Sequence, residues 1–319
     1  MKKISICIPC YNEENSVEEM YVRLVKIMKE YLQNYDYEII FVDDFSSDLT
    51  RDKIAQLCKK DIKVKAVFNA KNFGFHRNVF ESFKYASGDC VFLVFGDLQD
   101  PPEKLPDFVA EWEKGFKCIV GQKIKTEEGW LMTKFRKLYY KMIDTFSDKK
   151  QIQFMNGFGL YDRAFVDVLN DIDEVSPYFK TVISEYGMDI KIVPYEHAAS
   201  KRGKSNFNFL KNYDFAMHGL TSSTKMLMRL STFMAVGIGF VSIIFAIYIF
   251  IRKLLFWDTF PIGFATIFIG IFFFGAVQLF FIGVLGEYIL SINERVSKKP
   301  RVVIGEKINF QGNEENNVL

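Results

Sequence analysis

The stretch Val91–Glu103, VFLVFGDLQDPPE, limits what this chain can fold into more than any other stretch. Its apolar run, Val91–Phe95, has the length and continuity of a strand that is buried on both faces. Polar side chains follow at once, at Asp97, Gln99 and Asp100, and the next two residues are prolines, which suit the first turn of a helix. Such a strand end lies at the carboxyl edge of a sheet, where open α/β folds bind their ligands.

Two interpretations of this strand end are open. Carboxylate and amide oxygens are ligands for a hard cation such as Mg²⁺ or Mn²⁺, which makes Asp97 and Gln99 candidate metal ligands. The alternative is an ordinary polar turn between a strand and a helix, with side chains that cap the helix. The motif alone supports both, and the rest of the chain favours the first.

Strands alternate with helices through the first part of the chain, and polar clusters end the first four strands. This alternation predicts an α/β fold with a doubly wound, mostly parallel sheet, in which those clusters converge on one crevice. Ser16 and Glu19 have the spacing of a capping box for the first helix. The expected strands are Ile4–Ile8, Tyr37–Val42, Val64–Phe68, Val91–Phe95, Cys118–Val120 and Met188–Pro194, and the expected helices cover 16–32, 49–59, 77–86 and 103–114.

Two long apolar runs, Phe233–Ile251 and Pro261–Leu285, lie near the C-terminus, and each is long enough to cross a bilayer. Basic residues precede the first run and follow the second, so the positive-inside rule places both flanks in the cytosol. We therefore expect a two-helix transmembrane hairpin, although Arg252 and Lys253 in the link oppose this orientation. A pair of buried core helices is the alternative.

These patterns divide the chain into four parts. We expect a cytosolic domain over 1–205, an amphipathic juxtamembrane segment over 206–232, two transmembrane helices within 233–290 and a cytosolic polar tail over 291–319. The tail is expected to be disordered from Glu306 onward. Trp130–Phe146 has the pattern of a basic amphipathic helix on a bilayer surface, or of an ordinary helix packed on the sheet. The expected location is the inner (plasma) membrane, multi-pass, with the catalytic domain in the cytosol.

Charge and cysteine content restrict the partners and the chemistry. The 41 basic and 39 acidic residues give a net charge of +2, which does not favour nucleic acid as a partner, whereas the apolar runs predict a lipid bilayer. A homo-oligomer is left open. Cys7 and Cys10 have the spacing of a redox pair, but Cys7 falls inside the first predicted strand. Two reduced, buried thiols are therefore the preferred interpretation.

Three motifs, Pro9–Glu14, Val42–Asp48 and Asp97–Glu103, resemble the signatures of family 2 glycosyltransferases. With the paired C-terminal spans, the last motif resembles the polyprenyl-phosphate branch, which includes dolichol-phosphate mannose synthase and bacterial undecaprenyl-phosphate glucosyltransferases. The resemblance covers the chain from Ile4 to about Arg301. It implies a GT-A fold with a nucleotide-binding half and an acceptor half.

The resemblance also implies roles for residues of the donor site. Residues after the first strand would frame the nucleotide base and ribose, an aspartate after the second would bond the base, and Asp97 and Gln99 would hold Mg²⁺ or Mn²⁺ on the donor diphosphate. The residues assigned to the nucleotide-sugar donor are Pro9, Tyr11, Glu13, Asp43, Asp44, Lys71, Gly96 and Asp97.

On the acceptor side, Lys123 stands where the family usually has an arginine for the acceptor phosphate. Asn156–Leu160 matches a substrate-side loop, and Arg202–Ser205 matches a basic loop that closes over phosphate. The residues assigned to the acceptor are Lys123, Lys134, Arg136, Gly157, Arg202 and Ser205, and those assigned to catalysis are Asp97, Lys123, Arg202 and Lys204. An ordinary solvated surface charge is the alternative for each of these basic residues.

The chain departs from the family pattern at three positions. Phe95 replaces the first aspartate of the usual Asp-x-Asp motif, the loop at Gly157 carries no aspartate, and Asn206 replaces a basic residue. A lipid phosphate acceptor is already ionised at neutral pH, so its attack needs no strong general base and the missing aspartate matters less.

The expected activity is metal-dependent, inverting transfer of a sugar from a nucleotide-diphosphate sugar to undecaprenyl phosphate, for cell-surface glycan synthesis. One alternative is transfer to a hydroxyl of a lipid-linked saccharide, which requires a general base. A catalytically weak membrane scaffold, suggested by Phe95, is the other.

Overall fold

The computed structural model describes residues 1–124, 155–173, 179–196, 264–296 and 300–310, with isolated positions between 233 and 255. Expected features that fall elsewhere, including the amphipathic segments at 130–146 and 206–232, lie outside the described residues.

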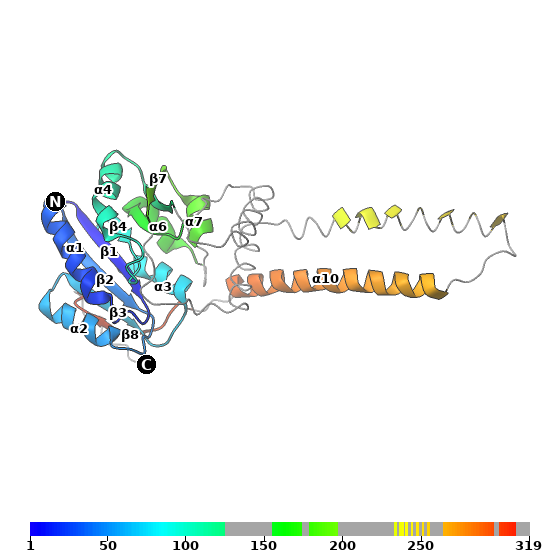
Figure 1. Cartoon of the computed structure of the whole chain (residues 1–319), viewed down its shortest axis with the longest axis horizontal. Helices are drawn as coiled ribbons and strands as arrows, with labels where there is room; N and C mark the ends of the chain where they lie inside the picture. Colours follow the sequence, from blue (N-terminus) through cyan, green and yellow to red (C-terminus); the bar gives the residue numbers. More distant parts are fainter. Residues whose placement is uncertain are drawn as a thin grey trace.

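An eight-stranded sheet forms the centre of the catalytic part, in the order β7-β5-β6-β4-β1-β2-β3-β8 (Figure 1). All strands except β6 and β8 run in one direction, which confirms the mostly parallel α/β sheet. The strands are β1 (Lys3–Cys10), β2 (Asp36–Asp43), β3 (Val64–Asn69), β4 (Cys90–Leu93), β5 (Cys118–Lys123), β6 (Gly159–Asp162), β7 (Ile190–Tyr195) and β8 (Ile304–Ile308).

The central strands form where the apolar runs predicted them. Residues of β4 are buried throughout, as are those of β1 from Ile4 to Cys10, because helices cover both faces of the sheet. Cys7 and Cys10 are buried thiols, which agrees with the non-redox interpretation. The strand β6 was not predicted, since its first two residues belong to the loop Asn156–Leu160 that matched a family motif.

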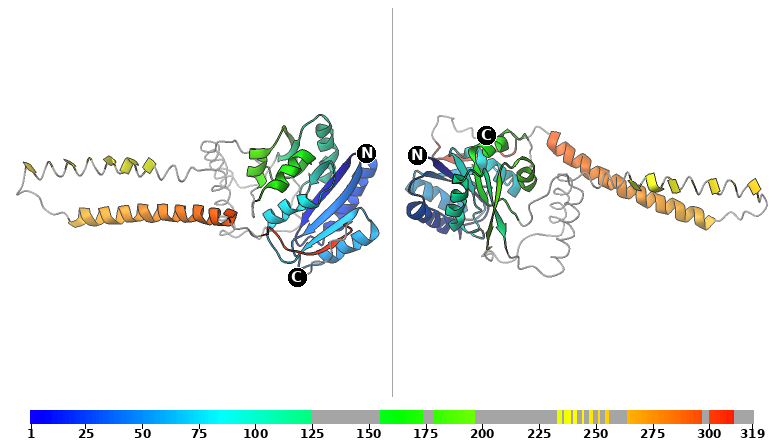
Figure 2. Two further views of the ribbon diagram at one scale, coloured as in Figure 1. Left: turned by 180° about the vertical axis from the view of Figure 1, so that it is seen from behind. Right: turned by 90° about the horizontal axis from the view of Figure 1, so that it is seen from above.

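Two groups of helices cover the sheet, and Figure 2 shows them from behind and from above. α1 packs against both α2 and α4 on one face, and α3, η1 and α6 cover the opposite face. The first helix begins after Ser16 as expected, but the predicted capping box is wrong, because the Ser16 hydroxyl donates to Glu13 instead. The helices are α1 (Val17–Tyr31), α2 (Thr50–Lys60), α3 (Phe75–Ser82), η1 (Phe83–Tyr85), η2 (Pro102–Lys104), α4 (Leu105–Glu113), α6 (Arg163–Asp171) and α7 (Phe179–Tyr186).

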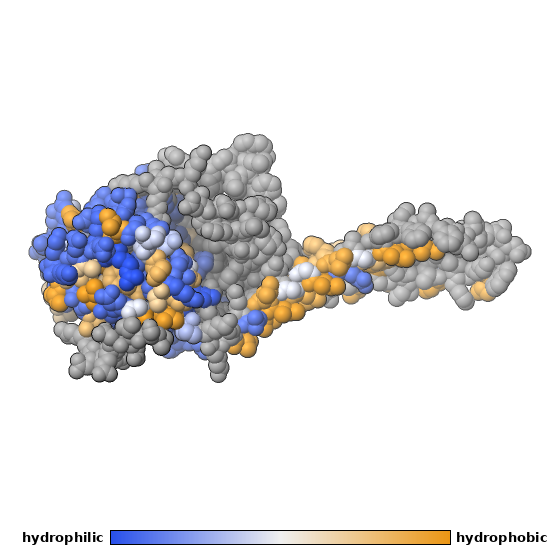
Figure 3. All heavy atoms as spheres, turned by 90° about the horizontal axis from the view of Figure 1, so that it is seen from below, coloured by the Kyte–Doolittle hydropathy of each residue, from blue (hydrophilic) through white to orange (hydrophobic). Residues whose placement is uncertain are grey.

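A single long helix, α10 (Phe264–Val296), extends away from the catalytic part (Figure 1). Its segment Phe273–Leu290 has a mean hydropathy of 1.8 and is the one stretch among the described residues that is long and apolar enough to cross a membrane. Only 6% of that segment is buried, and its surface is largely apolar in Figure 3, unlike a core helix of a soluble protein.

After α10 the chain returns to the sheet, contrary to the expected disordered tail. β8 pairs antiparallel with β3, and the Ala70 amide donates to the Val303 carbonyl at 2.8 Å. Asn309 Nδ2 donates to the carbonyls of Cys58 and Val64, both at 2.8 Å. The part of the tail over 304–308 is therefore an edge strand of the catalytic sheet.

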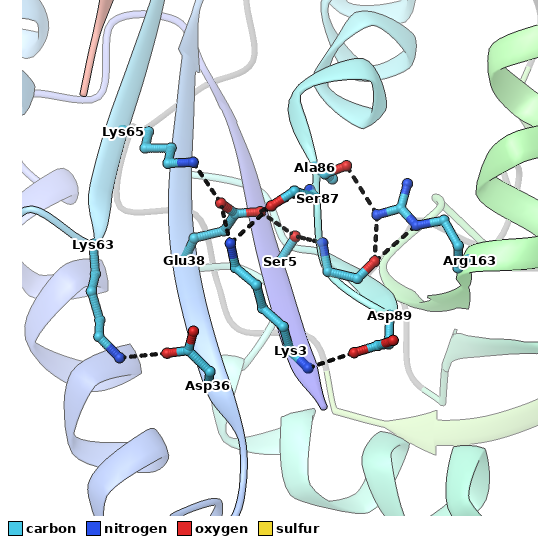
Figure 4. A network of polar contacts seen from close by, with 11 residues as sticks. Lys3, Ser5, Asp36, Glu38, Lys63, Lys65, Ala86, Ser87, Asp89 and Arg163 are labelled. Carbon is cyan, nitrogen blue, oxygen red and sulfur yellow. Dashed lines mark hydrogen bonds and ion pairs between the residues drawn. The ribbon is translucent and has the colours of Figure 1, made fainter. Parts of the chain in front are cut away.

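A buried charge cluster ties together the amino ends of the parallel strands (Figure 4). Glu38 is 1% exposed and accepts from Lys3 Nζ at 2.9 Å, Lys65 Nζ at 2.8 Å, Ser5 Oγ at 2.5 Å and the Ser87 amide at 2.8 Å. Burial alone raises the pKa of Glu38, but these hydrogen bonds outweigh it and lower the pKa to about 2. These groups at the amino edge therefore hold neighbouring strands together.

Candidate active site

The loops after β1 and β2 are joined by hydrogen bonds in both directions. The Asn12 amide donates to Ser46 Oγ at 2.8 Å, and the Ser47 amide donates to Asn12 Oδ1 at 2.9 Å. The Glu13 amide donates to Thr50 Oγ1 at 2.7 Å. The first two sequence motifs therefore lie side by side at the carboxyl edge, as the parallel sheet required.

Asp44 fixes the loop that follows β3. Its Oδ1 accepts from Asn69 Nδ2 and the Phe73 amide, both at 2.9 Å, and its Oδ2 accepts from the Gly74 amide at 2.8 Å. Asp44 is 2% exposed, and its carboxylate supplies hydrogen-bond partners for the two backbone amides that immediately precede α3. The sequence motif did not predict that Asp44 holds this loop in place.

The neighbouring Asp43 is also buried, but its side-chain hydrogen bonds are with Ser46 of its own loop. It accepts from both the amide and the hydroxyl of Ser46, the amide at 3.1 Å. Burial raises the pKa of Asp43, and the bonds from Ser46 partly offset that effect. Of the two aspartates, Asp43 is the less committed to holding another strand end in place.

Gly96, after β4, packs closely against the end of β1 and the loop that follows it. A Cβ atom at this position would lie 2.9 Å from Cys10 Sγ and 3.2 Å from Glu13 Cγ, which is too close for the sulfur. The Gly96 amide also lies 3.4 Å from the Pro9 carbonyl oxygen. The absence of a side chain therefore lets the Asp97 loop sit directly on the first motif.

Asp97 and Gln99 are half-buried at the end of β4. The Gln99 amide donates to Asp97 Oδ1 at 3.1 Å, and between them Leu98 has a φ of 57° in the left-handed region. Within the described residues no group of three or more His, Cys, Asp and Glu is placed to hold a metal ion. The oxygens of Asp97 and Gln99 fit Mg²⁺ or Mn²⁺ as a thin protein shell, since such ions keep other oxygen ligands from substrate and water.

Asp100 lies next to that pair but is buried, with 1% exposure. Asn156 Nδ2 donates to its Oδ2 at 2.7 Å, and the Tyr195 hydroxyl donates to its Oδ1. Burial raises the pKa of Asp100, and the nearby positive charge of Lys123 opposes this. Burial is the main cause that raises the pKa of Tyr195. The negative charge of Asp100 is the next cause, and that of Asp97 adds a smaller effect.

The predicted acceptor residues Lys123 and Gly157 lie on the elements that carry these partners. Lys123 ends β5 opposite Tyr195 of β7. Gly157 follows Asn156, has a φ of 101° and leaves no room for a Cβ, which would lie 2.7 Å from Phe179 Cδ1. Tyr195 itself was not predicted to be a site residue, and its only sequence signal is its place at the end of a predicted strand.

The remaining predicted residues divide into two groups. Pro9 is buried in β1, Tyr11 is exposed beyond it, and Lys71 is exposed with its ammonium 5.1 Å from the centre of the Phe73 ring. The second group lies outside the described residues and consists of Lys134, Arg136, Arg202, Lys204 and Ser205.

The comparison with known families agrees with this arrangement. The family profile described as glycosyl transferase family 2 matches residues 5–186, which is more than half of the chain. The chain belongs to glycosyl transferase family 2. It is therefore a glycosyltransferase, and the matched range contains all three motifs.

Curated relatives extend along nearly the whole enzyme. The SfII prophage-derived bactoprenol glucosyl transferase of Shigella flexneri is 31% identical over 313 residues, covering 98% of this chain and 99% of that protein. The undecaprenyl-phosphate 4-deoxy-4-formamido-L-arabinose transferase of Proteus mirabilis is 30% identical over 310 residues, covering 95% and 93%. These relatives place the enzyme in the polyprenyl-phosphate branch of the family.

The fold also matches a solved glycosyltransferase. The structure of glucosyl-3-phosphoglycerate synthase from Mycobacterium tuberculosis, in complex with Mn²⁺, uridine-diphosphate and phosphoglyceric acid, aligns with a TM-score of 0.50 and 16% identity. The alignment covers 69% of this chain and 76% of the other. At this identity the likeness concerns the GT-A fold, which it confirms.

Proposed function

We propose that this glycosyltransferase moves a sugar from a nucleotide-diphosphate sugar to a polyprenyl phosphate, with inversion at the anomeric carbon. The observation that carries the proposal is the carboxyl edge of the sheet, where the loop with Asp97 and Gln99 packs through Gly96 on the first motif, which in turn is hydrogen-bonded to the loop after β2. The choice of acceptor is supported by two relatives that align over nearly the whole of both chains. Their names refer to bactoprenol and to undecaprenyl phosphate.

In the donor half, the residues at the ends of β1 and β2 hold the nucleotide. Asp43 is our candidate for the base contact, because the Asp44 carboxylate already accepts three hydrogen bonds that fix the loop after β3. Tyr11 is 43% exposed at the same edge, where its ring is accessible to the base or ribose. Asp97 and Gln99 would hold a divalent cation, which supplies charge stabilisation for the departing diphosphate.

In the acceptor half, a lipid phosphate attacks the anomeric carbon through one of its oxygens, and the bond from that carbon to the diphosphate oxygen breaks. The second ionisation of a phosphate monoester has a pKa of roughly 6, so the nucleophile is already charged at neutral pH. This agrees with the absence of an aspartate beside Gly157 and with the burial of Asp100, which excludes it from contact with an acceptor proton.

The acceptor phosphate and the donor diphosphate repel each other, so cations must lie between or around them. Lys123, on β5 near Asp100, is the described candidate for this role. We assign Lys134 and Arg136, together with the loop containing Arg202, Lys204 and Ser205, to the same phosphate. Closure of that loop would exclude water and protect the activated sugar from hydrolysis.

We further propose that a two-helix hairpin anchors the enzyme in the inner membrane, with the catalytic domain in the cytosol. α10 supplies one span, and the described positions between 233 and 255 are helical and run beside it in each view (Figures 1 and 2). The return of the chain to the sheet as β8 supports a cytosolic end for α10, because β8 and β3 must share a compartment.

A donor panel tests the proposed reaction. The purified full chain in detergent is incubated with undecaprenyl phosphate, Mn²⁺ or Mg²⁺, and each of several uridine- and guanosine-diphosphate sugars, and the lipid products are weighed by mass spectrometry. We expect one donor to add a single sugar to the lipid phosphate, and only when metal is present. Absence of turnover with every donor would favour the scaffold interpretation instead.

A further inference from the structure

Asp100 connects the two halves of the active site although it is hidden from both substrates. It belongs to the same loop as Asp97 and Gln99, after β4 in the donor half. Among the described residues, two hydrogen-bond donors to it come from elsewhere: Asn156 from the loop before β6, and Tyr195 from the end of β7. One buried carboxylate thus bridges three separate chain segments.

The geometry decides which role this carboxylate has. A general base needs an accessible oxygen, but Asp100 is 1% exposed and each of its oxygens accepts a hydrogen bond from a protein donor. A buried carboxylate whose oxygens are engaged in this way is costly to disturb, because removal of one partner leaves buried polar atoms with neither a protein nor a water hydrogen bond. Asp100 is therefore suited to hold Asn156 and Tyr195 in fixed positions.

The elements that Asp100 joins are those that carry the proposed donor and acceptor contacts. Asp97 lies three residues before it, whereas Lys123 ends β5 directly opposite Tyr195 and lies close enough to affect the Asp100 carboxylate. Gly121 and Gly157 leave no room for side chains beside Tyr195 and Phe179, so the surrounding packing is tight.

We propose that Asp100 is a positioning residue, which with Tyr195 and Asn156 sets the separation between the Asp97 loop and the acceptor side of the site. This inference rests on the proposed function for its catalytic consequence, whereas the physical link rests on the contacts alone. A misplacement of about 1 Å between reacting groups costs about a hundredfold in rate. Loss of the link therefore lowers kcat more than it weakens donor binding.

Tyr195→Phe is the mildest test, since it removes one hydroxyl and keeps the ring. We expect about a tenfold lower kcat, a donor KM within about twofold of wild type, and faster amide hydrogen exchange in the peptide that contains residues 94–100. Tyr21→Phe is the matched control, because it removes a tyrosine-to-carboxylate bond to Asp61 of 3.0 Å elsewhere, and it should leave all three quantities unchanged.

Two substitutions at Asp100 separate positioning from charge. Asp100→Asn keeps an oxygen for Asn156 and an amide that can donate to the Tyr195 hydroxyl, so it should retain kcat to within about tenfold. Asp100→Leu is similar in size but bonds neither partner, and we expect about a hundredfold loss. The double variant Asp100→Leu/Tyr195→Phe should be no slower than Asp100→Leu alone, since both changes break one link.

The outcomes separate this inference from the proposed function. If wild type transfers sugar to undecaprenyl phosphate but Tyr195→Phe matches it in both kcat and amide exchange, the positioning role is wrong. Additive losses in the double variant would also overturn it. If wild type shows no such transfer, the proposed function fails, and amide exchange in Tyr195→Phe still tests the link by itself.

Discussion

Gly96→Ala should damage the active site through a contact that the structure defines. The added Cβ would lie 2.9 Å from Cys10 Sγ and 3.2 Å from Glu13 Cγ, whereas favourable contacts between such atoms need roughly 3.5–4 Å. The Asp97 loop or the first motif must therefore move by roughly 0.5–1 Å. Overpacking of this kind costs about 1–3 kcal/mol, and displacement of the catalytic loop lowers kcat by about ten- to a hundredfold.

The assay combines thermal unfolding of the full chain in detergent with sugar transfer. At about 2–4 °C per kcal/mol for a domain of this size, the unfolding temperature should fall by about 2–12 °C. Cys10→Ala removes the closer atom, so Gly96→Ala/Cys10→Ala should recover most of the lost activity. Gly305→Ala is the control, since its nearest neighbour, the Phe68 carbonyl oxygen, would be at an ordinary 3.4 Å. Wild-type kcat in Gly96→Ala, or no recovery in the double variant, would refute the packing argument.

Four further predictions concern other parts of the molecule. Asp97→Asn should nearly abolish transfer while leaving the unfolding temperature within a few degrees of wild type, and near-normal turnover at saturating Mn²⁺ would exclude Asp97 as the main ligand. Folding lowers the pKa of Glu38 from 4.5 to about 2, so this carboxylate contributes about 3 kcal/mol to the free energy of unfolding above pH 5, and the contribution disappears as the pH falls toward 2. The unfolding of Glu38→Gln should lack that part of the acid dependence. A pH profile of stability unchanged from wild type would contradict this. Asn309→Ala leaves two buried carbonyls without their donor and should destabilise the chain by about 1–3 kcal/mol, measured by the same unfolding assay, with no effect if β8 does not dock. A cysteine at Asp258 should react with an impermeant reagent in intact cells while one at Asn317 does not, and the reverse pattern would overturn the proposed hairpin orientation.

The parts of the fold that the sequence predicted are those governed by local pattern. Mostly apolar runs identified β1, β2, β3 and β4, and parallel pairing then brought their polar ends to one edge. β8 was missed because IGEKI is a short, half-polar edge strand that becomes a strand only by pairing with β3, more than two hundred residues earlier. The expected disorder of the tail was wrong over 306–308 for the same reason.

The same distinction between local sequence pattern and contacts of distant segments applies to the active site. The motifs located Asp97, Gln99 and Gly157, whose positions follow from strand ends and turns. The bond from Tyr195 to Asp100 spans 95 residues, and no local pattern encodes such a contact. Likewise, the motif could not distinguish Asp43 from Asp44, because the difference lies in three donors supplied by the end of β3 and the loop after it.

The central claim is that the acceptor is a lipid phosphate, and a comparison of acceptors tests it most directly. The full chain, its preferred nucleotide sugar and Mn²⁺ are incubated in parallel with undecaprenyl phosphate, undecaprenol and an undecaprenyl-linked saccharide, and product masses are measured. We predict one added sugar on undecaprenyl phosphate alone, in a linkage that mild acid cleaves. Sugar added to the saccharide, with undecaprenyl phosphate left unchanged, would contradict the account.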